Sequence, residues 1–151
     1  MIKILDKKTL DRSIYVIKFE SNEEVLDFVK SNKITKPISL AIIENNFINN
    51  VHGYDNFFKA LVNNQIDSVA IFGDHSKSIE DEIDDIIVKE NIENDDRTIM
   101  TTAWDTLKEL LEYTILSSSS NKNDDYKSCV ILLYPGVVSF DKVQEMINFI
   151  S

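Results

Sequence analysis

Three short apolar runs restrict the folds open to this chain more than any other feature does. They are Pro37–Glu44, Asp67–Gly73 and Ser128–Pro135, and each is bounded by polar, glycine or proline residues. An apolar run without alternation is typical of a strand that is covered on both faces. The three runs therefore predict strands of a parallel sheet between two layers of helices.

The segments between these runs have the patterns of helices. Ser21 and Glu24 have the spacing of a capping box and predict a helix that buries Val25, Phe28 and Val29. We expect Thr102 to cap another helix that starts near Trp104. Apolar residues at helical spacing predict further helices over 54–62, from Ser78 and from Ser139, and two more strands are predicted at 14–19 and 98–102.

Strand and helix thus alternate five times along one domain, residues 1–151. Such alternation implies right-handed crossovers and a parallel sheet with helices on both faces. We predict an α/β fold, a three-layer α/β/α sandwich with a mainly parallel five-stranded sheet of flavodoxin-like or Rossmann-like type. Residues 1–13 are ambiguous and could add a short edge strand. The pattern does not predict the strand order.

Charge and composition exclude several classes of function. The formal net charge of −10 argues against nucleic acid or an anionic membrane surface as a partner. The longest apolar runs are about seven residues, whereas a membrane helix needs about 20. The first residues lack the pattern of a secretory signal, and the single cysteine, Cys129, can form no intramolecular disulfide. We therefore expect a cytoplasmic protein.

Polar residues follow the predicted strands at the edge where open parallel sheets bind ligands. If the chain is an enzyme, its catalytic residues are expected there: Asp74, His75, Thr102 and Asp105. Asp74 could orient His75 as a general base, and Asp105 or Glu44 could join them. The same residues are also typical of an ordinary loop between a strand and a helix.

Motifs for cofactors and metals are absent from the sequence. Its three glycines cannot build a GxGxxG or Walker loop, which needs glycines so that the backbone can approach a phosphate closely. Its two histidines form no HxxxH or similar ligand pattern. We expect no cofactor and no metal, and these absences favour a protein that is not an enzyme.

Acidic residues are concentrated in one segment. Residues 80–96 contain nine acids and one lysine, so this segment holds most of the net charge. One interpretation is a solvated helix face. The other is a docking surface for a basic protein partner, made by Glu80, Asp81, Glu82, Asp84 and Asp85, with Trp104 as an apolar anchor.

Two stretches, Ala70–His75 and Met100–Asp105, carry a resemblance to a family of small bacterial α/β proteins without an assigned function. In that family a strand ends in glycine and a polar pair before an acidic helix, and a later strand ends in Thr-Thr-Trp-His. Here Ala103 precedes Trp104, and Asp105 stands in place of the histidine. The resemblance implies the same kind of fold.

In its size, acidity and lack of catalytic motifs the chain is similar in type to bacterial toxin-immunity proteins. This similarity implies an immunity protein that binds and neutralises a basic toxin. Two alternatives stay open. One is a small enzyme with a polar site at the carboxyl ends of the strands. The other is a homo-oligomeric module that associates through the helices at 54–62 and 139–151, and the oligomeric state is not predicted.

Overall fold

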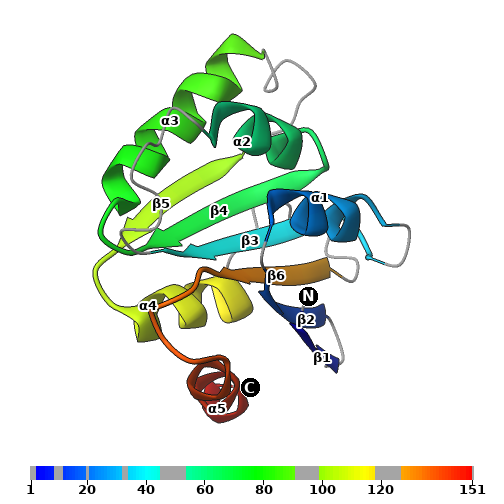
Figure 1. Cartoon of the computed structure of the whole chain (residues 1–151), viewed down its shortest axis with the longest axis vertical. Coiled ribbons are helices and arrows are strands. Elements are labelled where there is room, and N and C mark those ends of the chain that lie inside the picture. Colours follow the sequence, from blue (N-terminus) through cyan, green and yellow to red (C-terminus); the bar gives the residue numbers. More distant parts are fainter. Residues whose placement is uncertain are drawn as a thin grey trace.

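The protein is a twisted sheet between two layers of helices (Figure 1). The computed structural model describes residues 3–8, 12–19, 21–31, 34–44, 54–90, 99–117 and 127–150. The predicted Asn-rich loop at 45–50, the charged connection at 91–97 and most of the serine-rich loop at 117–125 lie outside these ranges. The elements are β1 (Lys3–Lys8), β2 (Arg12–Lys18), α1 (Asn22–Lys30), β3 (Ile38–Ile43), α2 (Asp55–Val62), β4 (Ile66–Phe72), α3 (Ser76–Lys89), β5 (Met100–Trp104), α4 (Leu107–Glu112), β6 (Lys127–Leu133) and α5 (Phe140–Ile150).

The sheet has the order β1-β2-β6-β3-β4-β5. The five strands from β2 to β5 in this order are parallel, which confirms the predicted sheet. The ambiguous N-terminal segment forms the edge strand β1, which pairs antiparallel with β2. The last strand in the chain, β6, lies in the interior of the sheet between β2 and β3.

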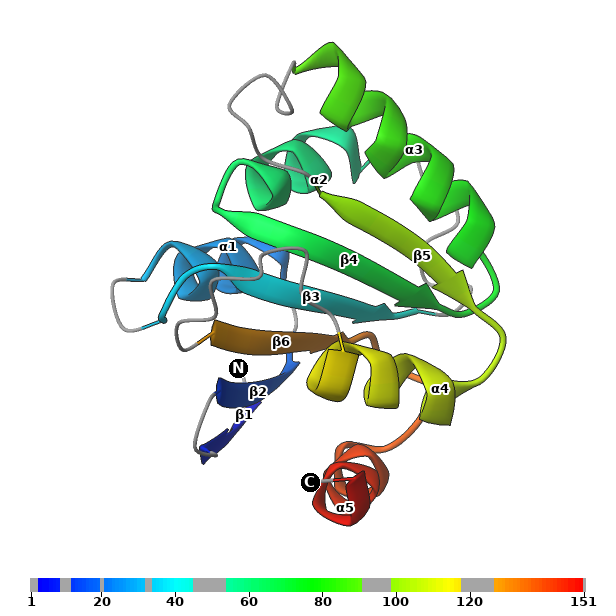
Figure 2. The ribbon, with the colours of Figure 1, turned by 180° about the vertical axis from the view of Figure 1, so that it is seen from behind.

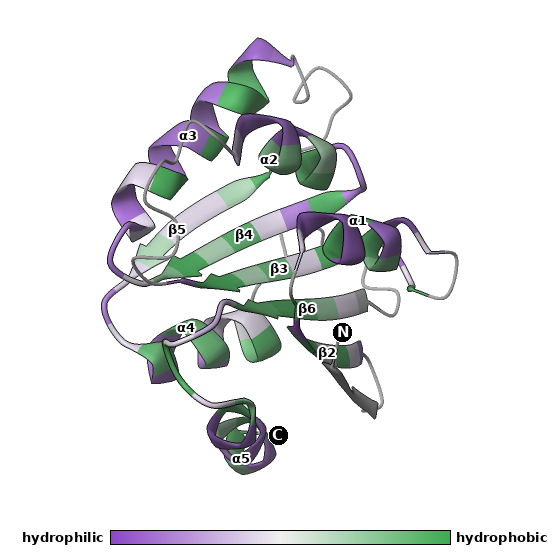
Figure 3. Ribbon diagram, viewed as in Figure 1, coloured by the Kyte–Doolittle hydropathy of each residue, from purple (hydrophilic) through white to green (hydrophobic). Residues whose placement is uncertain are grey.

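The face that each helix covers follows from the direction in which the chain moves across the sheet. From β2 through β3 and β4 to β5 the chain moves in one direction, so α1, α2 and α3 cover one face (Figures 1 and 2). The return from β5 to β6 places α4, and then α5, on the other face. Figure 3 shows the strands largely apolar between helices that are polar on their outer sides.

Local sequence signals decide where most helices begin. Ser21 and Glu24 form the predicted capping box at the start of α1. The prediction that Thr102 caps a helix is wrong, because β5 continues through Trp104 and pairs with β4 up to that residue. Thr106 caps α4 instead, and its hydroxyl oxygen accepts a hydrogen bond from the Glu109 backbone N–H at 3.2 Å. The helix continues past Glu112 as a π-helical turn, Tyr113–Ser117.

The strand order reverses between β3 and β6. The helix after β3 lies on one face of the sheet, and the helix after β6 lies on the other. In open α/β sheets this is the place where ligands bind, outside the carboxyl ends of the strands. Glu44 follows β3 and Tyr134 follows β6, so both stand at this point.

At Gly73, directly after β4, the backbone lies close to the backbone of Glu44 at the end of β3. The φ of Gly73 is +147°, and a Cβ atom there would lie 2.0 Å from the backbone oxygen of Glu44. Both the dihedral angle and the space thus require glycine. The close approach brings the loop after β4 against the end of β3.

We expect Gly73→Ala to lower the free energy of unfolding by about 2–4 kcal/mol, because the backbone must shift to remove the contact. Gly136→Ala, at another glycine with a positive φ, here 87°, is the control. It should cost about 1–2 kcal/mol, the usual penalty of that conformation. Urea denaturation measures both variants. Equal losses would contradict a role for the close approach.

Candidate functional site

A buried carboxylate organises the carboxyl edge of the sheet. Glu44 is 0% exposed, and its Oε1 accepts the backbone N–H of His75 at 2.5 Å. Its Oε2 lies 3.2 Å from His75 Nδ1. His75 is the residue before α3, a helix that has no side-chain cap of its own and no acid in its first turn. Glu44, at the end of β3, therefore accepts a backbone N–H at the start of α3 that would otherwise have no partner within the helix.

The surroundings of Glu44 disfavour its charged form. Burial raises the pKa of the Glu44 carboxyl, while the bonds from His75 act in the opposite direction. Tyr134 lies on the same side of the sheet, and within the described residues its buried hydroxyl has no hydrogen-bond partner. Burial also raises the pKa of Tyr134, with smaller contributions from Tyr54 and Glu44.

Beside this group lies an acidic cleft of about 540 Å³. Asp74 comes from the loop after β4 and Asp105 from the loop after β5. Trp104 forms part of the wall; its ring packs against Tyr113 with 5.0 Å between centroids, and its Nε1–H donates to Thr102 Oγ1 at 2.8 Å. Among the residues that line the cleft none is basic, and they are Glu44, Phe72, Gly73, Asp74, Ser76, Trp104, Asp105, Gly136 and Val137.

The structure brings together some of the residues that were predicted to be catalytic. Asp74 and Asp105 line the same cleft. His75 and Thr102 do not line it, and Thr102 instead accepts the hydrogen bond from Trp104. Glu44, and not Asp74, contacts His75. The signal for Glu44 was present in the sequence, since a charged residue closes an otherwise apolar strand.

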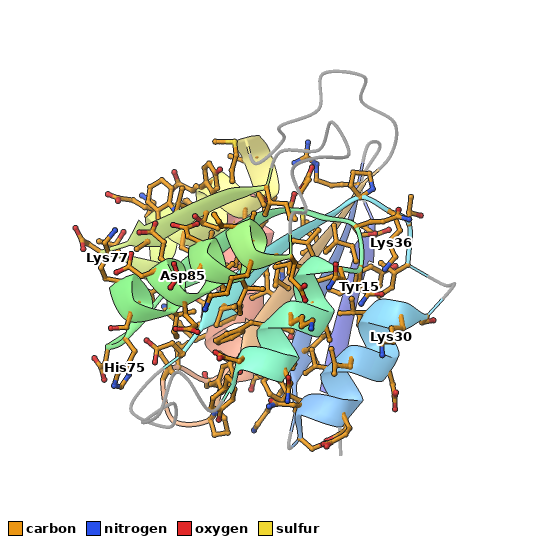
Figure 4. All side chains as sticks on the ribbon, turned by 90° about the horizontal axis from the view of Figure 1, so that it is seen from above. Tyr15, Lys30, Lys36, His75, Lys77 and Asp85 are labelled. Carbon is orange, nitrogen blue, oxygen red and sulfur yellow. The ribbon has the colours of Figure 1, made fainter. Side chains whose placement is uncertain are left out.

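The acidic helix α3 exposes only part of its charge. Asp81, Asp84 and Asp85 are exposed, and Figure 4 places His75 and Lys77 near the start of the helix and Asp85 further along it. Glu80 and Glu82 are expected to share a solvated face or docking surface with the three aspartates, and this expectation is wrong, because these two residues are only 9% and 7% exposed. Since α3 packs against both the sheet and α2, it buries more than the stripe of isoleucines.

Asp84 lies next to the edge strand of the sheet. Its carboxylate accepts a hydrogen bond from the Thr101 hydroxyl in β5. Lys77 pairs with Glu80 at 2.5 Å and lies 3.7 Å from Asp81. Asp84 thus lies near the amino end of β5, and Asp105 follows its carboxyl end.

The two helices expected to expose apolar surface differ. Phe57, Phe58, Leu61 and Val62 of α2 are buried. On α5, Phe149 is 89% exposed and borders a groove of about 300 Å³ toward Lys108 of α4. Self-association through α5 stays a prediction, which light scattering would test.

Two absences hold for the described ranges alone. Within them, His, Cys, Asp and Glu side chains form no group of three or more that could hold a metal ion. No helix there has the length and apolar character needed to cross a membrane.

Comparison with known proteins gives a family and a fold. The profile of a family described as a domain of unknown function (DUF7684) matches residues 14–147. No curated protein sequence matches the chain. Among solved structures, a UDP-N-acetylmuramoyl-L-alanyl-D-glutamate–2,6-diaminopimelate ligase is similar, with a TM-score of 0.56 and 13% sequence identity. The similarity covers 97% of this chain but 31% of the ligase, and at this identity it shows the fold alone.

The raised pKa of Glu44 predicts how the variant Glu44→Gln responds to pH. Burial in the folded protein favours the protonated carboxyl of Glu44. The stability that this group contributes is therefore fully present below its pKa in the unfolded chain, and it is lost as pH rises through its pKa in the folded protein. The stability of the wild type relative to Glu44→Gln should therefore decrease as pH rises from about 4 toward neutrality. Urea denaturation at a series of pH values measures this difference.

The exposed Glu23→Gln on α1 serves as the control for loss of a carboxylate. A relative stability of Glu44→Gln that is constant over the same pH range would contradict the assigned effect of burial.

Proposed function

The chain belongs to the DUF7684 family, and we propose that it is a non-catalytic acidic binding protein that recognises a basic protein partner. One observation carries the proposal. Asp74 and Asp105, from two different loops, line one cleft beside Trp104, and none of the described residues that line it is basic. An arginine or lysine side chain of a partner has the charge that complements this position.

The chemistry of the cleft favours a cation. Two carboxylates can accept charge-assisted hydrogen bonds from a guanidinium or ammonium group, and such bonds are stronger than those between neutral groups. The indole of Trp104, half-buried in the wall, adds the attraction of an aromatic face for a cation, about 0.5–1 kcal/mol at an exposed site. An anionic ligand would be repelled by both carboxylates.

The exposed acids of α3 add to the negative charge of the cleft. We call Asp74, Asp81, Asp84, Asp85 and Asp105 the acidic surface. Lys30 and Lys36 lie at the other side of the molecule, around α1 (Figure 4), whereas Lys77 lies beside Asp81. Exposed ion pairs contribute about 0–1 kcal/mol each, so the main effect of the acidic surface is fast and oriented association. Affinity then comes from the cleft and Trp104.

The more specific form of the proposal is a bacterial immunity protein that binds a basic toxin in the cytoplasm. Its support is the similarity in type that the sequence has to such proteins, together with the acidic surface. A toxin with a basic active site would be blocked when this surface covers it.

A small enzyme is the alternative function, and it too has an observation in its favour. Glu44 holds the ring of His75 through Nδ1, the arrangement in which a carboxylate orients a general base. Against it, His75 does not line the acidic cleft, so a ligand bound between Asp74 and Asp105 would not meet the imidazole there. Binding of a basic partner uses the cleft as it stands.

The test replaces the five carboxylates of the acidic surface by amides, Asp74→Asn, Asp81→Asn, Asp84→Asn, Asp85→Asn and Asp105→Asn. The probe is a capped heptapeptide in which four arginines precede three valines. We expect the affinity to fall about 10- to 100-fold, since several weak pairs and the cleft contacts are lost together. Isothermal calorimetry at two salt concentrations measures the affinity and its salt dependence.

The matched control neutralises exposed acids elsewhere: Glu23→Gln and Asp27→Asn on α1, Glu109→Gln on α4, and Asp141→Asn and Glu145→Gln on α5. This control should lose less than about 3-fold, because it changes net charge without touching the surface. Equal losses in both proteins would mean that net charge alone attracts the peptide, and the proposal would be wrong.

A further inference from the structure

Within the part of the chain that the structure describes, one side of the edge strand β5 has no neighbouring strand. It is the last strand of the sheet, and within the described ranges it pairs only with β4. An edge strand directs alternate backbone N–H and C=O groups outward, where another strand can bond to them. Met100 is 43% exposed and Ala103 is also exposed, whereas every residue of β3 is buried.

The residues of β5 do not protect this edge. Natural edges are often blunted by lysine, other charges or proline. The sequence Met-Thr-Thr-Ala-Trp has none of these, and threonine and tryptophan favour strands. The strand is therefore suited to accept an added segment of about five residues.

The two sides of β5 have different chemistry. Thr101 points toward α3, because its hydroxyl donates to Asp84. Trp104 packs on the opposite side, among the residues of α4 and the π-helical turn. Since side chains alternate along a strand, Met100 shares the side of Trp104, and Ala103 shares the side of Thr101. One side is thus acidic, and the other carries a methionine and an indole.

We infer that the basic partner contributes an extended segment that adds to β5 as a further parallel strand. The inference rests on the proposed function and specifies the form of the partner. Basic side chains of the segment face Asp84 and the neighbouring exposed acids of α3, and apolar side chains alternate with them on the side of Met100. A parallel segment that pairs with Met100–Trp104 ends at the carboxyl end of β5, where its last basic residue reaches Asp105 and the cleft.

Two capped heptapeptides of the same composition test the inference. One alternates arginine and valine, and the other is the block peptide described above. The alternating peptide should bind at least about 10-fold more tightly, because only it can place both side-chain types while its backbone bonds to β5. Amide hydrogen exchange should slow at alternate residues of Met100–Trp104 when the alternating peptide is bound.

A charge introduced at the edge tests the same contact from the side of the protein. Ala103→Lys places a lysine among the basic side chains of the segment and should weaken the alternating peptide about 10-fold. Phe149→Lys on α5, at a side chain that is 89% exposed on the other face, adds the same charge and should change the affinity less than about 3-fold.

The outcomes separate the two proposals. If both peptides bind equally and exchange in β5 is unchanged, strand addition is wrong while recognition of a basic partner stands. If neither peptide binds, the proposed function is wrong, and the inference fails with it. Selective protection of β5 by the alternating peptide supports both.

Discussion

The buried carboxylate of Glu44 is the interaction on which the carboxyl edge depends. It has no contact with solvent, and its hydrogen bonds come from the backbone and the ring of His75. A buried carboxylate that loses such partners carries a large desolvation cost. The end of β3 and the start of α3 are therefore held together, and Gly73 permits the approach. Where Asp74 lies, and hence the shape of the cleft, follows from this contact.

Patterns within about ten residues predicted most of the elements. The capping box of Ser21 and Glu24 forms as expected, and the continuous apolar runs became β3, β4 and β6. The error at Thr102 has a long-range cause. Both Thr102 and Thr106 have an acid three residues later, and the pairing of Phe72 with Trp104 decides between them. No local pattern contains that pairing, and the strand order is hidden from local patterns for the same reason.

The candidate site could be predicted in part. That Asp74 and Asp105 share one edge follows from the rule that parallel strands end together. The contact between Glu44 and His75 required knowing that β3 and β4 are neighbours. Burial of Glu80 and Glu82 could not be predicted, because helical periodicity defines one apolar stripe and does not show how far the neighbouring elements cover the flanks of that stripe. The acidic surface is consequently smaller than the composition of the helix suggests.

The position of β6 has a consequence for how the chain folds during synthesis. This strand is made last, yet it separates β2 from β3 and bonds to both. Until residues 127–133 emerge from the ribosome, β3, β4 and β5 can pair with one another while β1 and β2 form only a separate hairpin. Two interior strands then present unpaired edges, the kind of surface that promotes aggregation of nascent chains. Closing the sheet requires pairing over more than 80 residues of sequence, a topology that slows folding.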